Sequence, residues 1–267
     1  MTGIADEHRA HGSKVPAITL GFWIAKIFAT TLGETAGDAV TMSWLGETTP
    51  DASSAVSGYL IGTAIFGAIL LALVVVQIRA RGFHPLLYWA TIIASTTAGT
   101  TLADFATRSL GIGYAGGSLL LLALVFASLG SWKAVEGKVS AADIRTARTE
   151  AFYWITITFS QTLGTALGDW AADTGGLGYL GGAALFGGLI AVVALVYFTT
   201  NLSRVALFWA AFILTRPLGA TVGDFLDKPV AQGGLNLSRS LASIVLAAAI
   251  VVIVWLTARK KPDSPTA

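Results

Sequence analysis

The sequence predicts an all-α integral membrane protein whose eight transmembrane helices form four parallel two-helix repeats in a pseudo-symmetric bundle. Three observations support this prediction. First, 54% of the 267 residues are hydrophobic and only 12% are charged, about half the charged share of a typical soluble domain. Second, four runs near or above the roughly 18–20 residues needed to cross a bilayer contain no charge. Third, one motif recurs four times. The charge-free runs are 52–78, 109–132, 174–203 and 240–258.

The recurring motif is a Trp followed by a Gly ten residues later and an Asp fifteen residues later. Its Trp residues lie 66, 65 and 55 residues apart, which is the spacing of a repeat array. The motif positions are Trp23, Trp89, Trp154 and Trp209, and Asp38, Asp104, Asp169 and Asp224. We expect the Trp residues to be anchors at the cytoplasmic membrane interface, where Trp is enriched.

Each repeat is predicted to contain two helices, the first with the motif and the second more uniformly apolar. The eight predicted spans are 18–42, 56–77, 86–106, 113–131, 152–172, 178–199, 206–226 and 237–257. A long connection at 133–150 separates repeats 1 and 2 (18–132) from repeats 3 and 4 (151–257), with tails at 1–17 and 258–267.

Positive charges orient the array. Twelve of the 17 Lys and Arg residues lie on one set of helix ends, and three lie on the other. The positive-inside rule therefore predicts that both termini and the 133–150 connection face the cytoplasm. The first 17 residues lack the pattern of a cleaved signal peptide, so we expect the first span to be its own insertion signal.

The four motif copies and the two-helix repeats resemble a family of bacterial membrane proteins built from four tandem repeats of unknown function. Each repeat of that family has two transmembrane segments and a characteristic Trp. The resemblance covers the chain from about Trp23 to Trp255. It implies the fold and a multi-pass location in the bacterial inner membrane, but it implies no activity.

A polar stripe follows one face of each motif helix. At 100° per residue, positions 7 and 11 residues after the Trp lie within about 40° of it, and the Asp lies within about 60°. These positions are occupied by Thr30, Thr96, Gln161 and Arg216 at offset 7, and by Glu34, Thr100, Thr165 and Ala220 at offset 11. Because polar groups facing lipid are costly, the polar stripe should face protein or water.

Small residues 10 and 14 positions after each Trp predict close helix packing. The glycines at these positions are Gly33, Gly37, Gly99, Gly164, Gly168, Gly219 and Gly223. Since fifteen helical residues rise about 22 Å, the four Asp residues should share one level in the outer third of a hydrocarbon core about 30 Å thick.

Carboxylates at one level need compensation, because like charges and burial both disfavour the ionised form. A bound cation, protonation or an internal basic residue could provide it. Glu34 adds a fifth acid one turn before Asp38, and Arg216 is expected to be a counter-ion for Glu34 or an Asp. Lys26 lies near the cytoplasmic end, and we expect its side chain to extend to that interface.

These features predict a membrane transporter or channel-like protein for a small cation, in particular a divalent metal, or for a proton-coupled small solute. The four Asp residues would be the metal ligands, and Glu34, Arg216 and the polar stripe would line the pathway. Carboxylate and hydroxyl oxygens suit hard cations. The cation would be substrate, so no permanently bound cofactor is expected. The expected partners are the lipid bilayer and a second copy of the chain, and a net charge of +2 does not indicate nucleic acid.

An alternative from another class is a non-transporting membrane scaffold or sensor that self-associates or binds a membrane partner. In that case the Asp residues would cap turns, as in residues 169–176, or make polar helix-packing contacts. An enzyme is not expected, because the spans hold no nucleophile–His–acid set and the chain has no Cys.

Overall fold

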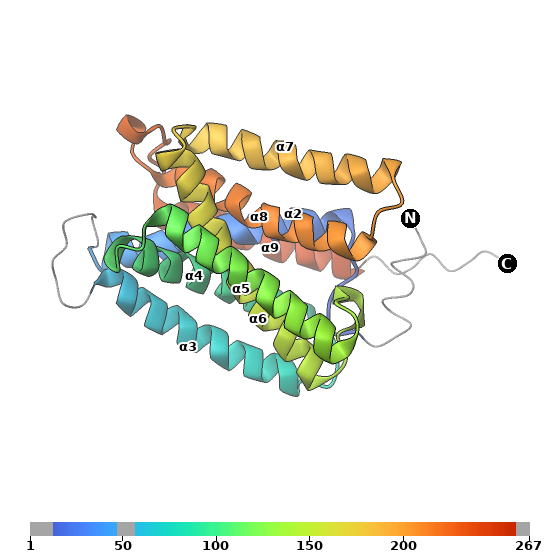
Figure 1. Ribbon diagram of the computed structural model, residues 1–267. Coiled ribbons are helices and arrows are strands. Elements are labelled where there is room, and N and C mark those ends of the chain that lie inside the picture. Colours follow the sequence, from blue (N-terminus) through green and yellow to red (C-terminus); the bar gives the residue numbers. More distant parts are fainter. Residues whose placement is uncertain (1–12, 47–56, 260–267) are drawn as a thin grey trace.

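The protein is entirely helical over the residues that its computed structural model describes, 13–46 and 57–259, where no strand occurs. Eight long α-helices follow one another along the chain (Figure 1). They are α2 (Leu20–Asp38), α3 (Gly58–Arg79), α4 (Pro85–Asp104), α5 (Gly113–Glu136), α6 (Ala147–Asp169), α7 (Gly178–Thr199), α8 (Arg204–Asp227) and α9 (Arg239–Arg259). The all-α prediction is confirmed, and each predicted span coincides with one of these helices.

The four motif helices form an inner ring. Helix α2 packs against α4, α4 against α6, α6 against α8, and α8 against α2. The other four helices lie outside this ring, and each packs on the motif helix of the following repeat: α3 on α4, α5 on α6, α7 on α8, and α9 on α2 (Figure 1). The repeats therefore exchange contacts in a closed cycle, and α9 completes it by packing on the first motif helix.

This cycle bridges the two halves that the sequence suggested. Helix α5 of the first half packs on α6 of the second, and α9 of the second half packs on α2 of the first. The connection at 133–150 includes the end of α5, a short 3₁₀ helix (Ala141–Asp143) and the start of α6. The predicted tails lie mostly outside the described residues.

Local sequence signals explain where several helices begin. The Ser57 and Thr19 hydroxyls accept hydrogen bonds from backbone N–H groups of the first turns of α3 and α2, as N-cap residues do. Thr146 and Thr149 form a reciprocal capping box at the start of α6. Gly113 and Gly178 have φ of 73° and 64°, a left-handed conformation that favours glycine at the sharp turns into α5 and α7.

Three motif helices change their winding directly after the motif Asp. Short π-helical segments follow α2 (Ala39–Trp44), α4 (Phe105–Ser109) and α6 (Trp170–Thr174), whereas α8 continues as an α-helix to Asp227. Such segments are rare and are often found at functional sites. The sequence pattern did not predict them.

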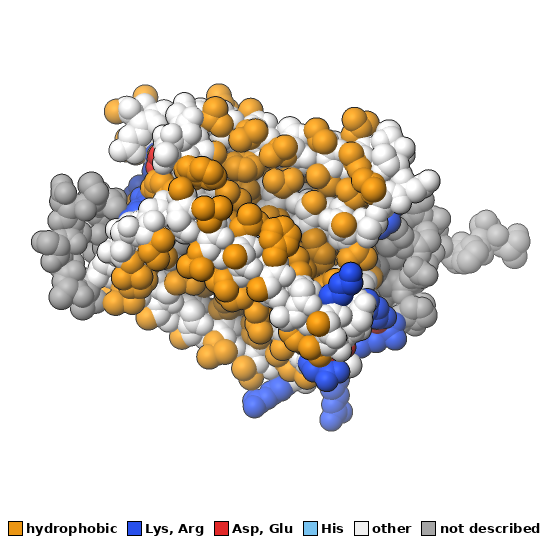
Figure 2. Space-filling view, in the orientation of Figure 1, with side chains coloured by type: hydrophobic (Ala, Val, Ile, Leu, Met, Phe, Trp, Pro, Cys, Tyr) orange, Lys and Arg blue, Asp and Glu red, His pale blue; other side chains and the backbone are white. Residues whose placement is uncertain are grey.

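Within residues 13–46 and 57–259, five helices are long and apolar enough to cross a membrane: α3, α5, α7, α8 and α9. The most apolar 18-residue windows of the outer helices α3, α5, α7 and α9 are only 11–22% buried, against 56% for α8. Figure 2 shows hydrophobic side chains spread across the middle of the visible face, with Lys and Arg side chains gathered mainly toward one end. An apolar exterior around a polar interior is the arrangement that a bilayer favours, so a membrane location is consistent with the fold.

An aromatic core fills one end of the inner ring. Trp89, Trp154 and Trp209 are 6%, 2% and 4% exposed, and they pack with Phe22, Tyr88, Trp132, Tyr153, Phe208 and Phe212. The prediction that the motif Trp residues anchor the membrane interface is therefore wrong for these three, and Trp23 is also partly buried against this core. Sequence suggested an interface because Trp is common there, but the closed ring turns the indoles inward.

The segment before α2 is fixed to the same end of the molecule. The Lys14 Nζ atom donates to the carbonyl oxygens of Gln77 and Ile78 and lies 2.8 Å from the Glu150 carboxylate. Burial raises the pKa of the Glu150 carboxyl, and the Lys14 ammonium opposes part of that shift. This ion pair thus joins the N-terminal segment to the end of α3 and the start of α6.

Candidate functional site: a buried layer of acids and bases

The motif glycines bring neighbouring ring helices into close contact. A Cβ atom on Gly33 would lie 1.9 Å from Thr96 Oγ1, and one on Gly219 would lie 2.2 Å from Thr30 Oγ1. The glycine at offset 10 thus faces the offset-7 residue of the next repeat: Gly33 faces Thr96, Gly99 faces Gln161, Gly164 faces Arg216 and Gly219 faces Thr30. At offset 14, Gly37 faces Thr100, Gly168 faces Ala220 and Gly223 faces Glu34. The predicted small-residue packing is confirmed.

Stripe threonines hydrogen-bond across these contacts. The Thr96 hydroxyl donates to the Ala29 carbonyl at 3.1 Å, and the Thr30 hydroxyl donates to the Thr215 carbonyl at 3.1 Å. In both cases an offset-7 hydroxyl reaches the offset-6 carbonyl of the preceding repeat. The polar stripe faces the inside of the ring as predicted, and Thr30, Thr96, Thr100, Gln161, Thr165 and Arg216 are all fully buried.

Arg216 lies at the centre of the ring. Its Nη2 atom is 2.9 Å from Glu34 Oε2, 2.5 Å from Thr100 Oγ1 and 2.6 Å from Thr165 Oγ1. The offset-11 residues of three repeats therefore converge on one guanidinium. Glu34 is 2% exposed, so this is a buried, hydrogen-bonded ion pair, and Glu34 is confirmed as the partner among those the sequence left open for Arg216.

A second basic residue, Arg108, joins the motif Asp residues of repeats 2 and 3. Its Nε atom lies 3.0 Å from Asp104 Oδ1, and its Nη2 atom lies 3.2 Å from Asp169 Oδ2. Lys228 has the equivalent position in repeats 4 and 1. Its Nζ atom is 3.1 Å from Asp224 Oδ1 and also forms an ion pair with Asp38 Oδ2. Each basic side chain thus pairs with the Asp of its own repeat and with the Asp of the next.

Arg108 and Lys228 are two of the three basic residues that the charge pattern placed at the other set of helix ends, and their role in the site was not predicted. The signal was present, because both lie four residues after a motif Asp, which is one helical turn. The corresponding residues in repeats 1 and 3 are Met42 and Asp173. Repeats 2 and 4 therefore supply the basic groups, and repeats 1 and 3 supply only acids.

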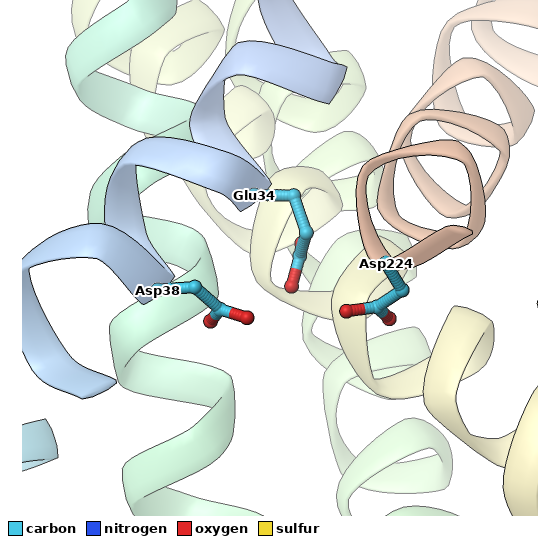
Figure 3. Close-up of side chains that lie close together, drawn as sticks. All are labelled: Glu34, Asp38 and Asp224. Carbon is cyan, nitrogen blue, oxygen red and sulfur yellow. The ribbon is translucent and has the colours of Figure 1, made fainter. Parts of the chain in front are cut away.

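The four motif Asp residues do not gather at one point. The structure divides them into two pairs around the two basic residues, and it adds Glu34 to only one pair. Ligand oxygens of Glu34, Asp38 and Asp224 lie within 4.8 Å of one another. Figure 3 shows these carboxylates, two from α2 and one from α8, turned toward the space between the helices. All three side chains are buried, and Asp38 Oδ1 has no hydrogen-bond partner among the described residues.

The alternative in which the motif Asp residues cap turns is not supported. Asp38, Asp104 and Asp169 precede the π-helical segments, and none of them makes a side-chain capping bond there. Their carboxylates point instead to the basic side chains inside the ring. The structural alternative for the motif Asp residues is therefore polar packing between helices.

Lys26 does not reach the interface that was expected for it. It is fully buried, its Nζ atom is 3.3 Å from Gln161 Oε1, and it lies 4.2 Å from the centroid of the Phe212 ring. The extension to the interface predicted from sequence is wrong because the aromatic core covers this end of the ring. Gln161 Nε2 also lacks a hydrogen-bond partner among the described residues.

The fold and site define a helical repeat protein with a membrane-type exterior and a buried layer of acids and bases. The chain belongs to the DUF347 family, a repeat of unknown function whose model matches residues 21–83, 87–138, 152–203 and 207–262. These matches confirm the four tandem repeats. Comparison with curated proteins and with solved structures gives no match.

Proposed function

We propose that this protein is a transporter or channel-like protein for a small cation, in particular a divalent metal, or for a proton-coupled small solute. The observation that carries the proposal is the cluster of Glu34, Asp38 and Asp224, whose ligand oxygens lie within 4.8 Å of one another inside the ring. Buried carboxylates in a membrane protein are costly unless they serve a function or are fully paired.

The buried layer is not fully paired. It contains the carboxylates of Glu34, Asp38, Asp104, Asp169 and Asp224, and the basic groups of Arg108, Arg216 and Lys228. Within this ion-pair network, five acids against three bases leave two negative charges in excess. Other buried groups lie outside the network, since Asp227 pairs with Arg239 and Lys26 contacts Gln161 and Phe212. Protons or a cation would compensate this excess, and oxygen ligands favour hard cations such as magnesium, manganese or calcium. The ion would be substrate rather than a resident cofactor.

The membrane arrangement is part of the same proposal. Five of the described helices are apolar enough to span a bilayer, and we propose that α2, α4 and α6 span it too, because their polar stripes face one another inside the ring and are buried there. Both termini and the 133–150 connection would face the cytoplasm of a bacterial inner membrane. The motif Asp residues are at most 3% exposed, so this conformation would be an occluded one.

Flux into proteoliposomes tests the proposal. Purified protein is reconstituted with a metal-sensitive or pH-sensitive dye inside, and MnCl₂, MgCl₂, CaCl₂ or acid is added outside. We expect influx that Asp38→Asn abolishes, because Asn keeps the shape of Asp but removes its charge. Asp143→Asn is the control, since Asp143 pairs with Lys138 and Arg145 in the connection. If the unmodified protein moves neither protons nor any of these ions, the transport proposal fails.

A second candidate is a non-transporting scaffold or sensor, and the burial of the acid layer favours it. Every stripe and motif side chain discussed above packs against protein. A scaffold needs only such dry packing, whereas a transport pathway needs water to reach these side chains. In this case the apolar outer helices would assemble the protein with itself or with a membrane partner. Absent flux together with a stable homo-oligomer in light scattering of the purified protein would support this candidate.

A further inference from the structure

The four-fold pattern of the ring is broken at the contact between α2 and α8. Offset 11 carries the acid Glu34 in repeat 1, where the other repeats have Thr100, Thr165 and Ala220. The basic residue at that contact is Lys228, where the opposite contact between α4 and α6 has Arg108. Two departures from the repeat pattern, Glu34 and Lys228, therefore lie at the same helix contact.

Lys228 lies at the C-cap of α8, with its side chain directed back into the ring. Its Nζ atom pairs with Asp38 and with Asp224, two of the three members of the carboxylate cluster. The residue is 6% exposed. An ammonium held by two carboxylates stands where a bound cation would be coordinated, and the partnerless Asp38 Oδ1 leaves one oxygen ligand unused.

The chemistry of the two basic residues differs. Arg108 has a planar guanidinium whose Nε and Nη2 atoms each face a different Asp, a rigid and permanently charged bridge. Lys228 offers a compact point charge on a flexible stem, which can leave its ligands by rotating its side chain. The cluster therefore has a counter-ion that can be exchanged, and the opposite pair has one that is fixed.

From these observations we propose that Lys228 is a tethered cation that occupies the Glu34–Asp38–Asp224 site and is displaced by a divalent metal ion. The charges favour this class of ligand. Three carboxylates and the Arg216 guanidinium carry a net charge of −2 once the ammonium has left, which one divalent cation neutralises. With the ammonium in place the net charge is −1, so the site neutralises a divalent cation only when the ammonium has left.

A carboxylate adjacent in the chain can receive the displaced ammonium. Asp227 precedes Lys228 and is 3% exposed, and both of its carboxylate oxygens lack a hydrogen bond among the described residues. Its ion-pair partner Arg239 lies 3.5 Å away. Rotation of the Lys228 side chain toward Asp227 would keep its charge paired while the metal takes Asp38 and Asp224.

Thermal unfolding of the purified protein in detergent across a MnCl₂ titration tests this inference, because a ligand of the folded state raises its stability with concentration. We expect Lys228→Met to lower the Mn²⁺ concentration for half-maximal stabilisation by about tenfold or more, since a competing unit charge is removed from the site. Adding Asp38→Asn to this variant should abolish the response. Arg108→Met is the matched control, and it should not gain Mn²⁺ affinity, because its pair has no third carboxylate.

An unchanged Mn²⁺ midpoint in Lys228→Met, or an equal gain in Arg108→Met, would overturn the inference. If Lys228→Met does not fold, Lys228→Arg decides the question. This substitution keeps the positive charge, but the guanidinium should leave the site less readily than the ammonium. The Mn²⁺ response of this variant should therefore be weaker than that of the unmodified protein, and an equal response would refute displacement.

This inference rests on the proposed function, and the two can fail separately. Mn²⁺ influx by the unmodified protein, combined with Mn²⁺ binding that no Lys228 variant changes, would remove the tethered cation and leave transport standing. Tighter Mn²⁺ binding by Lys228→Met, with no influx of protons or of any tested ion by the unmodified protein, would confirm the occupied site and remove transport.

Discussion

Replacing Arg216 by Met should destabilise the protein strongly, because it leaves Glu34 buried without its counter-ion. Arg216 is fully buried and Glu34 is 2% exposed, with 2.9 Å between Nη2 and Oε2. Breaking a buried pair by removing one partner costs about 3–5 kcal/mol. Met is preferable to Ala, since the Arg216 Cβ and Cγ atoms fill the contact with Gly164 and a truncation would add a cavity.

The second change in this experiment is Glu34→Gln. In the Arg216→Met background it removes the unpaired charge, so the double variant should recover roughly 2–3 kcal/mol of the loss. At roughly 2–4 °C per kcal/mol for a chain of this size, the single variant should unfold about 6–20 °C lower. Thermal unfolding by circular dichroism in one detergent measures both values, and a double-mutant cycle gives the coupling energy.

An exposed ion pair provides the control. Arg148 is 69% exposed and pairs with Glu136 in the connection, so Arg148→Met should cost less than about 1 kcal/mol. A double variant no more stable than Arg216→Met alone would show that Glu34 is not the group left uncompensated. A small loss in Arg216→Met, similar to that of Arg148→Met, would refute the reasoning from burial altogether.

Three further predictions follow from packing, charge and topology. Gly219→Ala should destabilise the fold by about 1–3 kcal/mol, because the new Cβ would lie 2.2 Å from Thr30 Oγ1. Gly67→Ala is the control and should be neutral or stabilising, because a Cβ there would have nothing within 4 Å. Equal unfolding temperatures of the two variants would contradict the close approach of the helices. Lys26→Met should raise the unfolding temperature, since no carboxylate contacts this buried ammonium among the described residues, and a lower temperature would point to a partner. Accessibility labels at both termini and in residues 133–150 should all report the cytoplasm, and periplasmic labelling of one of them would overturn the orientation.

The sequence alone determined the number of helices, their approximate limits and the inward polar stripe. These features follow from local rules. Charge-free runs set the lengths of the four outer helices, the constant spacing of fifteen residues fixed the face that each Asp shares with its Trp, and the glycines marked the contact surface. The family match over four segments agrees with the repeat read from the motif. Helix periodicity relates residues within one helix, which is why these predictions succeeded.

Only the tertiary structure decided which residues meet across the ring. Closure of α8 onto α2 brings Arg216 and Lys228, near the end of the chain, to Glu34 and Asp38 near its beginning. No periodicity within a helix encodes that register, because it depends on glycine contacts between different repeats. The same closure buries Lys26 and three motif Trp residues that single-helix reasoning assigned to the membrane interface. A residue's depth along its helix could be read from the sequence, but its partner depended on how four helices close into a ring.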